Sequence, residues 1–222
     1  MPLHSRLSQL IEELTPDLEG RGFTRKRGHA LWARDLPSGL ETVALAFSPD
    51  DEDGGWVEPF VGLVEQRVET TMATALDAPV TYGLRHTLLV GATKWTKPGM
   101  PKQPVHDGSE VLEATNEVLR WLDVNLRDLA ERFCGKRASP NGQVARDIDL
   151  TSLDALFNGE RPESRRYVPH ELYRSIRGLV IAKQVRPYDL VEVLSFHRAR
   201  LIDNGFWEVY GEQIRRFAAG LG

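Results

Sequence analysis

The chain is poor in cysteine, with Cys134 as the only one among its 222 residues. An internal disulfide is therefore impossible, and a zinc site built from several thiolates cannot form. A chain of this length buries enough surface on folding to be stable without a metal or a disulfide. These features favour a reducing compartment, so we expect a cytoplasmic protein that carries no cofactor.

Long apolar runs are missing as well. The longest stretch that resembles a membrane span, residues 84–90, is far shorter than the roughly 20 residues that cross a bilayer. Residues 1–20 carry Arg6, Glu12 and Asp17 among their leucines, which leaves no apolar signal-peptide core. We therefore expect no membrane partner.

Neither sign of charge is in large excess. The formal net charge is −4, which disfavours binding of nucleic acid over the whole surface but leaves room for a local basic patch. Hydrophobic residues make up 41% of the chain, which is enough to build a core and excludes disorder as the main state.

Motifs of known chemistry are scarce. There is no Gly-x-Ser-x-Gly elbow, and Gly54-Gly55 lacks the Lys and Ser/Thr of a phosphate-binding loop. No two histidines stand at the i, i+4 spacing of a helical metal site; the six are His4, His29, His86, His106, His170 and His197. We predict no catalytic residues and no metal site, with surface histidines throughout. An approach of His86 to His106 across the fold is the alternative.

The first half of the chain changes its apolar period from helical to extended. Residues 3–18 repeat every three or four positions and predict a helix that kinks or restarts at Pro16, with Thr15 as N-cap, and that ends at Gly20 and Gly22. Short alternating segments within residues 23–68, separated by turns rich in Gly, Pro and Asp, then predict an antiparallel meander. A short helix over residues 70–76 and a fifth strand over residues 87–95 complete this half.

The second half is predicted to be helical. After a Pro-rich loop over residues 96–107, residues 109–133 form the most regular helical stripe, capped by Ser109 and closed by Gly135. Residues 136–148 are polar and rich in turn residues, which suits a boundary. Four further helices are expected: residues 150–157, one from Pro169, one from Pro187 with Leu190, Val191, Leu194 and Leu201 on its apolar face, and a last one with Trp207, Tyr210, Ile214 and Phe217.

These patterns predict an α+β fold. An antiparallel sheet of four or five strands packs on two helices, the first one and the long central one, and a helical C-terminal segment follows. The predicted division is an α+β domain over residues 1–135, a linker over residues 136–148 and the helical segment over residues 149–222. Packing of that segment into one domain with the rest is the alternative.

The order of a helix, a Gly-Phe pair and a hairpin with a central aromatic residue resembles a bacterial family known as domain of unknown function 4304. The residues that carry the resemblance are Leu14, Pro16, Leu18, Gly22, Phe23, Arg25, Gly28, His29 and Trp32, residues 43–47 and 60–64, and Trp95. The resemblance covers residues 3–133. It implies an α+β module of bacterial origin, brings no agreed catalytic residues, and leaves the C-terminal helices unaccounted for.

The candidate binding site is the most basic stretch of the chain, which consists of Arg25, Lys26, Arg27, His29 and Arg34 with Phe23 and Trp32 interleaved. On a hairpin, Arg25, Arg27 and their neighbours could offer phosphate contacts beside an aromatic platform. The alternative is the solvated side of a sheet whose other side, with Phe23 and Trp32, belongs to the core.

Other polar clusters have a structural and a functional interpretation each. The acidic loop of residues 50–53 suits a hairpin tip better than a calcium loop, because it lacks the ligand spacing. Arg161, Arg165, Arg166 and Tyr167 form a second basic cluster, which is either a solvated loop or a site for an acidic partner or a phosphate. Cys134 follows a helix C-terminus, where the helix dipole disfavours a thiolate, and Asp149 suits a helix N-cap.

Three functions remain from the sequence. The first is a non-catalytic protein-interaction module, with a regulatory or toxin-neutralising role by analogy. The second is nucleic-acid binding through the basic hairpin of residues 25–34. The third is a hydrolase that gathers residues such as His29, His106 and Asp53 from separate loops.

Overall fold

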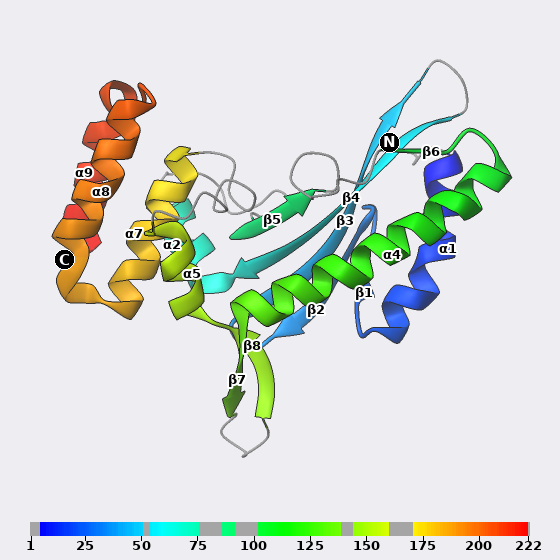
Figure 1. Ribbon diagram of the computed structural model, residues 1–222, viewed down its shortest axis with the longest axis horizontal. Helices are drawn as coiled ribbons and strands as arrows, with labels where there is room; N and C mark the ends of the chain where they lie inside the picture. The colour runs from blue at the N-terminus through cyan, green and yellow to red at the C-terminus, as the bar shows by residue number, and fades with distance from the viewer. Residues whose placement is uncertain are drawn as a thin grey trace.

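The computed structural model describes residues 5–50, 54–75, 86–91, 102–138, 144–159 and 171–221 (Figure 1). The described elements, in chain order, are α1 (Ser5–Gly20), β1 (Thr24–Arg25), β2 (Leu31–Leu36), β3 (Gly39–Pro49), β4 (Gly55–Glu65), α2 (Gln66–Ala75), β5 (Leu88–Gly91), β6 (Gln103–Pro104), α4 (Gly108–Phe133), β7 (Cys134–Ala138), β8 (Val144–Ile148), α5 (Leu150–Phe157), α7 (Glu171–Val185), η1 (Pro187–Asp189), α8 (Leu190–Asp203) and α9 (Trp207–Leu221).

The predicted α+β fold is confirmed. The strands β1 to β5 follow one another in an antiparallel sheet, and the two-residue strand β6 pairs with β4 beside β5. The helices α1 and α4 lie side by side over one face of this sheet, as the pattern predicted (Figure 1). The C-terminal helices gather at the end of the molecule that lies farthest from α1.

The strand register explains why the alternation of apolar and polar residues was enough to predict the sheet. Trp32 on β2 pairs with Val43 on β3, Val43 with Val61 on β4, and Val61 with Val90 on β5. This row of four side chains crosses the sheet on one face, and none of them is more than 1% exposed. A shift of any strand by one residue would turn its apolar row to the other face, so the register is strongly specified.

The predicted end of the first helix is confirmed. Gly22 has a φ of 83°, a conformation that suits glycine, and its N–H donates to the carbonyl of Glu19 at 2.9 Å. The N–H of Phe23 donates to the carbonyl of Leu18 at 3.0 Å. This pair of hydrogen bonds is a Schellman motif, and the buried side chains of Leu18 and Phe23 supply its apolar contact.

The predicted restart at Pro16 is wrong, because α1 runs through that residue as one helix. Thr15 is not an N-cap. Its hydroxyl donates to the carbonyl of Ile11 at 2.6 Å and accepts from the indole Nε1 of Trp32 at 3.3 Å. The apolar stripe of α1 stays fully buried on both sides of the proline, at Leu14 and Leu18, so packing against the sheet outweighs the lost backbone hydrogen bond.

Three helix boundaries differ from the prediction. Asp107 rather than Ser109 caps α4, and its Oδ1 accepts the N–H groups of Ser109 at 2.8 Å and Glu110 at 3.0 Å. Gly135 does not end that helix in a turn, since the chain passes directly into β7. The strand predicted to reach residue 68 ends at Glu65, whose carboxylate accepts the N–H of Val68 at 2.6 Å in the first turn of α2.

The described parts of the predicted linker form strands. Within residues 136–148 lie most of β7 and all of β8, which pair as an antiparallel hairpin whose tip, residues 139–143, lies outside the described residues. The carboxylate of Asp147 accepts from the N–H of Ser38 at 2.8 Å and from its hydroxyl at 2.6 Å. Arg146 reaches the fully buried Glu41 at 2.6 Å. These polar residues fix the hairpin to the β2–β3 turn and to the start of β3.

The helical C-terminal segment shares the core of the sheet. Leu153 and Phe157 of α5 and Val180 and Ile181 of α7 belong to the same cluster of buried side chains as the sheet and α1. A second cluster joins α2 to the inner faces of α7, α8 and α9; its buried members are Met72, Leu172, Ile176, Leu179, Ala182, Val193, Leu201 and Ile214. The division of the chain into separate folding domains stays a prediction.

A buried ion pair crosses the junction between the sheet and the helical segment. The guanidinium of Arg177 on α7 donates to both carboxylate oxygens of Glu69 on α2, at 2.7 and 2.9 Å. Both side chains are only 8% exposed. The hydroxyl of Thr87, just before β5, donates to the same carboxylate at 2.8 Å and accepts the N–H of Glu65 at 2.9 Å. One carboxylate therefore ties α2, α7 and the start of β5 together.

Close packing also fixes α8 on α7. His197 is fully buried, and its Nε2 lies 2.7 Å from the Oδ1 of Asn158. The Nδ2 of Asn158 donates to the carbonyl of Gly178 at 3.0 Å. A Cβ at residue 178 would overlap both Asn158 and His197, so glycine is required at this crossing.

Within the residues that the structure describes, no helix is both long and apolar enough to cross a bilayer.

Loss of the buried guanidinium should destabilise the whole chain. In Arg177→Met, the carboxylate of Glu69 loses its bidentate partner inside the protein, so we expect the free energy of unfolding to fall by about 3–5 kcal/mol. Urea unfolding followed by circular dichroism measures it. The matched control is Arg120→Met, which removes a pair whose two side chains are 74% and 44% exposed, and a change below about 0.5 kcal/mol is expected there. Equal effects of the two substitutions would contradict this account.

Candidate functional site

The structure places the aromatic residues of the predicted basic site inside the protein. Trp32 is fully buried and Phe23 is 2% exposed. Both belong to the core that the sheet forms with α1 and α4, because their positions share the inner face of the sheet. The expected aromatic platform at Trp32 is therefore wrong, and the alternative interpretation of these two side chains as core residues is right.

The arginines of the same stretch divide into two groups. Arg34 is half-buried, its Nε donates to Glu41 at 3.0 Å, and another nitrogen donates to the carbonyl of Arg21 at 2.8 Å. Its guanidinium lies 4.7 Å from the ring centre of Phe23. Arg34 is thus committed to contacts within the chain.

The other basic residues of the stretch surround the turn between β1 and β2. Arg25 on β1 is half-buried, whereas Lys26, Arg27 and His29 are exposed around Gly28, whose φ is 79°. The surface that remains is a small basic tip rather than a basic and aromatic face. A role of these residues in binding stays a prediction.

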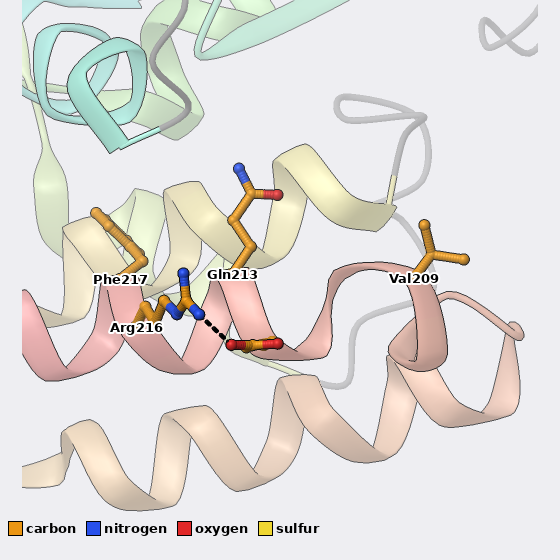
Figure 2. Close-up of a pocket in the computed structure, with 5 residues that line it drawn as sticks. Val209, Gln213, Arg216 and Phe217 are labelled. Atoms are coloured by element: carbon orange, nitrogen blue, oxygen red, sulfur yellow. Dashed lines mark hydrogen bonds and ion pairs between the residues drawn. The ribbon is translucent and has the colours of Figure 1, made fainter.

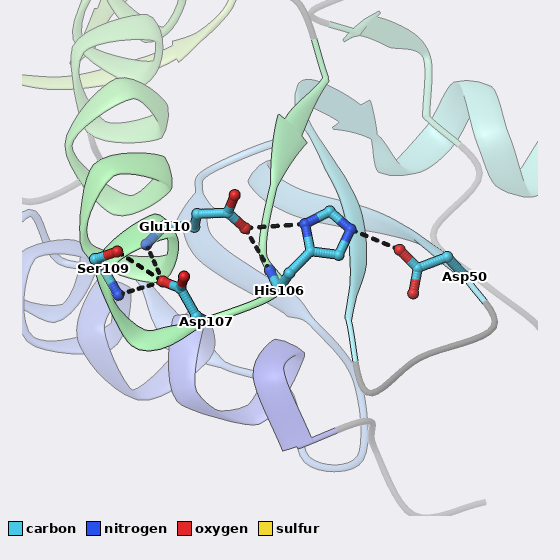
Figure 3. Close-up of polar contacts among 5 residues, drawn as sticks. All are labelled: Asp50, His106, Asp107, Ser109 and Glu110. Carbon is cyan, nitrogen blue, oxygen red and sulfur yellow. Dashed lines mark hydrogen bonds and ion pairs between the residues drawn. The ribbon is translucent and has the colours of Figure 1, made fainter.

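A cluster of three titratable side chains stands where β3 and β4 meet the start of α4 (Figure 3). His106 lies between two carboxylates, with its Nδ1 2.9 Å from Glu110 and its Nε2 2.6 Å from Asp50. Its backbone N–H also donates to Glu110 at 2.7 Å. Trp56 meets the imidazole edge-on, at 5.7 Å between the ring centres.

The carboxylates decide what this histidine can do. Hydrogen bonds to Glu110 and Asp50 raise the pKa of His106 above its ordinary value, because they favour the imidazolium with both nitrogens protonated. Both ring nitrogens of His106 already contact carboxylates of this chain, so neither is directed at open space. These hydrogen bonds connect the end of β3 to the first turn of α4.

The histidines considered for a shared site lie apart. His106 packs against Gly54 and His86 against Gly62, so eight positions of the chain along β4 separate them, or about 26 Å at the rise of a strand. His29 sits in the turn after β1, and β2 and β3 separate that turn from β4. Of the residues proposed for a hydrolase site, Asp53 lies outside the described residues, and His29 and His106 are not brought together.

The remaining sequence candidates have structural roles where they are described. Burial raises the pKa of the Cys134 thiol, which agrees with the expectation that this cysteine is not activated. Asp149 caps α5 as predicted and accepts the N–H of Thr151 at 2.9 Å. The second basic cluster, Arg161, Arg165, Arg166 and Tyr167, lies outside the described residues. In the described part of the chain, no three His, Cys, Asp or Glu side chains are arranged to hold a metal ion.

The outer faces of the last helices carry the most exposed apolar side chains in the described chain. Tyr188 in η1 is 98% exposed, Val191 on α8 is 79% exposed and Val209 on α9 is 69% exposed. The prediction had placed Val191 on the buried face of its helix. That expectation is wrong, because the buried face of α8 consists of Val193, His197 and Leu201.

An open groove of about 560 Å³ follows the exposed face of α9 (Figure 2). Its described lining is Val209, Glu212, Gln213, Arg216 and Phe217. In Figure 2 the side chain of Gln213 points away from the helix axis, while Arg216 turns toward Glu212, with which it forms an ion pair. The lining combines an apolar end at Val209 with a charged centre.

The opposite face of α9 fixes the helix to the protein, so the groove has a firm base. Ile214 is fully buried in the second apolar cluster. Trp207 at the start of the helix contacts two guanidinium groups, those of Arg198 and Arg215. Their Cζ atoms lie 5.5 and 5.7 Å from the centre of its ring. Gly211 allows the ring to approach, since a Cβ there would stand 2.7 Å from it.

Sequence reasoning found α9 by its buried stripe but missed the groove. The available signal was an apolar residue off that stripe: Val209 falls outside the face marked by Trp207, Tyr210, Ile214 and Phe217. A single exposed valine is common on protein surfaces, so that signal alone carries little weight.

No protein-family model matches the chain, and neither the curated proteins nor the solved structures contain a detectable match. The resemblance to domain of unknown function 4304 therefore stays a prediction. Trp95, one of the residues that carry it, lies outside the described residues.

The histidine environments predict three distinct titrations. His106 should titrate above its ordinary pKa, whereas burial lowers the pKa of His86 to about 4 and that of His197 to about 3. A depressed histidine pKa stabilises the folded state above pH about 6.5, and this stability is lost as the pH falls from there toward the folded pKa. The stability linked to His106 has the opposite sign and is lost as the pH rises through its raised pKa.

Imidazole NMR signals followed from pH 3 to 9 measure these pKa values. Glu110→Gln should lower the pKa of His106 and leave that of His197 unchanged, because only the first histidine touches Glu110. Three overlapping titrations near the ordinary histidine pKa would contradict the assigned contacts.

Proposed function

We propose that the chain is a non-catalytic protein-interaction module that binds another protein through the outer faces of α8 and α9. The observation that carries the proposal is that, among the residues that the structure describes, the three most exposed large apolar side chains, Tyr188, Val191 and Val209, lie on this one segment. Covering such a side chain removes apolar surface from water and contributes roughly 1–3 kcal/mol when burial is complete.

The groove on α9 supports the same interpretation. Its described lining has two apolar side chains, Val209 and Phe217, and two charged ones, Glu212 and Arg216. Apolar and polar contacts occur together in protein-protein interfaces. The helix is held from behind by Ile214 and Trp207, so a partner would meet a surface that is already ordered, which lowers the entropy cost of binding.

Nucleic-acid binding is the second candidate function. It is favoured by the three exposed basic side chains around Gly28, which are Lys26, Arg27 and His29. Two of the five residues proposed for that site, Trp32 and Arg34, make their contacts inside the chain, so fewer groups remain to contact phosphates.

Site-specific photocrosslinking tests the proposal. A photoreactive amino acid at residue 209 should give a discrete protein adduct in lysate of the source organism, because Val209 lies within the proposed interface. The matched control is residue 124, a valine on α4 that is 55% exposed, where no discrete adduct is expected. Equal adducts at the two positions, or none at residue 209, would contradict the proposal. An adduct with nucleic acid from residue 27 alone would favour the second candidate instead.

A further inference from the structure

The exposed face of α9 is complementary to itself. Val209, Gln213, Arg216 and Gly220 follow one another at spacings of four, three and four residues, which places them on one line along the helix. Glu212 stands beside this line and pairs with Arg216 of the same chain. The line therefore has a valine at one end, a glycine at the other, and an amide and a base between them, with an acid beside the base.

We infer that the groove on α9 receives α9 of a second copy of this chain, in an antiparallel helix pair. This inference rests on the proposed function, because it names the partner of the same groove. A two-fold axis between Ile214 and Arg215 would place Val209 of one copy opposite Gly220 of the other, and Gln213 opposite Arg216. Each contact then occurs twice, as a two-fold symmetric interface requires.

The apolar ends match in size. Val209 is 69% exposed, so its side chain is available to a partner. At Gly220, nothing lies within 4 Å of where a Cβ would stand, which leaves space above the helix at that end. A valine that packs over a glycine lets two helices approach closely, and the antiparallel pairing forms this contact at both ends of the helix pair.

The charges select the antiparallel orientation. Glu212 precedes Gln213, so in this pairing each Arg216 comes within reach of Glu212 of the other copy as well as of Gln213. The same two residues form an exposed pair within one chain, with side chains 79% and 69% exposed, and such a pair contributes little stability. Exchange of partners in the dimer costs little for that reason. A parallel pairing would instead place Arg216 opposite Arg216, which like charges disfavour.

The size of the contact sets the expected affinity. One helix of 15 residues is about 22 Å long, so the pair buries less than the roughly 1,200 Å² of a standard stable interface. A weak dimer in the micromolar range follows, with a monomer-dimer equilibrium that changes over a protein concentration from about 1 to 100 µM.

Charge exchange at two positions tests this inference by sedimentation velocity. Glu212→Arg brings a second arginine against Arg216 of the other copy, and Arg216→Glu brings two glutamates together, so each variant alone should sediment as a monomer where wild type dimerises. An equimolar mixture of the two variants should dimerise again, because one copy then carries only bases and the other only acids at these positions. The double variant Glu212→Arg with Arg216→Glu should behave as wild type does.

Controls separate loss of association from loss of folding. Glu117 and Arg120 form a comparably exposed pair on α4, so Glu117→Arg should leave the dimer unchanged. Unchanged circular dichroism of the single variants shows that they fold. Wild type that stays monomeric at the highest concentration, or a mixture that fails to recover the dimer, would overturn the inference.

The same data keep this inference distinct from the proposed function. If wild type is monomeric while residue 209 crosslinks to a different protein, the dimer is wrong and the interaction module stands. If residue 209 crosslinks to a second copy of the chain, both stand. If wild type is monomeric and residue 209 gives no adduct, both fail.

Discussion

The buried ion pair between Glu69 and Arg177 sets where the last helices lie relative to the sheet. Its carboxylate also accepts the hydroxyl of Thr87 at the start of β5, so α2, α7 and the sheet meet at one polar group inside an apolar junction. A buried charge without its partner is costly in free energy, so α2 and α7 are restricted to positions that keep the two side chains in contact. The contact of His197 with Asn158 then fixes the position of α8 on α5 and α7. The groove on α9 stands at the end of this series of contacts.

The periodic spacing of apolar residues predicted much of the fold, because the strands and the end of α1 depend on contacts that a local pattern can specify. The row from Trp32 to Val90 needs only alternate apolar residues, and the end of α1 needs only Gly22 and an apolar residue after it. Where the prediction was wrong, a long-range contact decided the outcome. Thr15 and Pro16 locally indicate a helix start, yet α1 continues through them as one helix packed on the sheet. The hairpin of β7 and β8 depends on Ser38 and Glu41, more than a hundred residues earlier.

The candidate site was less predictable than the fold. Sequence reasoning selected Arg25, Arg34 and Trp32 because basic and aromatic residues stood together. Arg25 pairs with Trp32, and Arg34 lies two positions along β2 from Trp32, so all three share the face of the sheet that α1 covers. Trp32 became core, and Arg34 became a partner of Glu41. The exposed surface of α8 and α9 depends on which face of each helix packs against α7. The apolar pattern alone placed Val191 on the buried face of α8, and that assignment was wrong. The sequence carries the residues of the groove without indicating that they are exposed.

Native-state hydrogen exchange in increasing denaturant tests most directly whether the helical segment shares one core with the sheet. The account predicts that amides in the centre of α7, around residues 176–181, open with the same free energy as those in β4 around residues 61–63, because Val180 and Ile181 belong to the same buried cluster as Val61 and Leu63. Opening of α7 at a clearly lower free energy, with β4 still protected, would contradict it. The helical segment would then be a separate unit, and the sheet would not determine the position of α9.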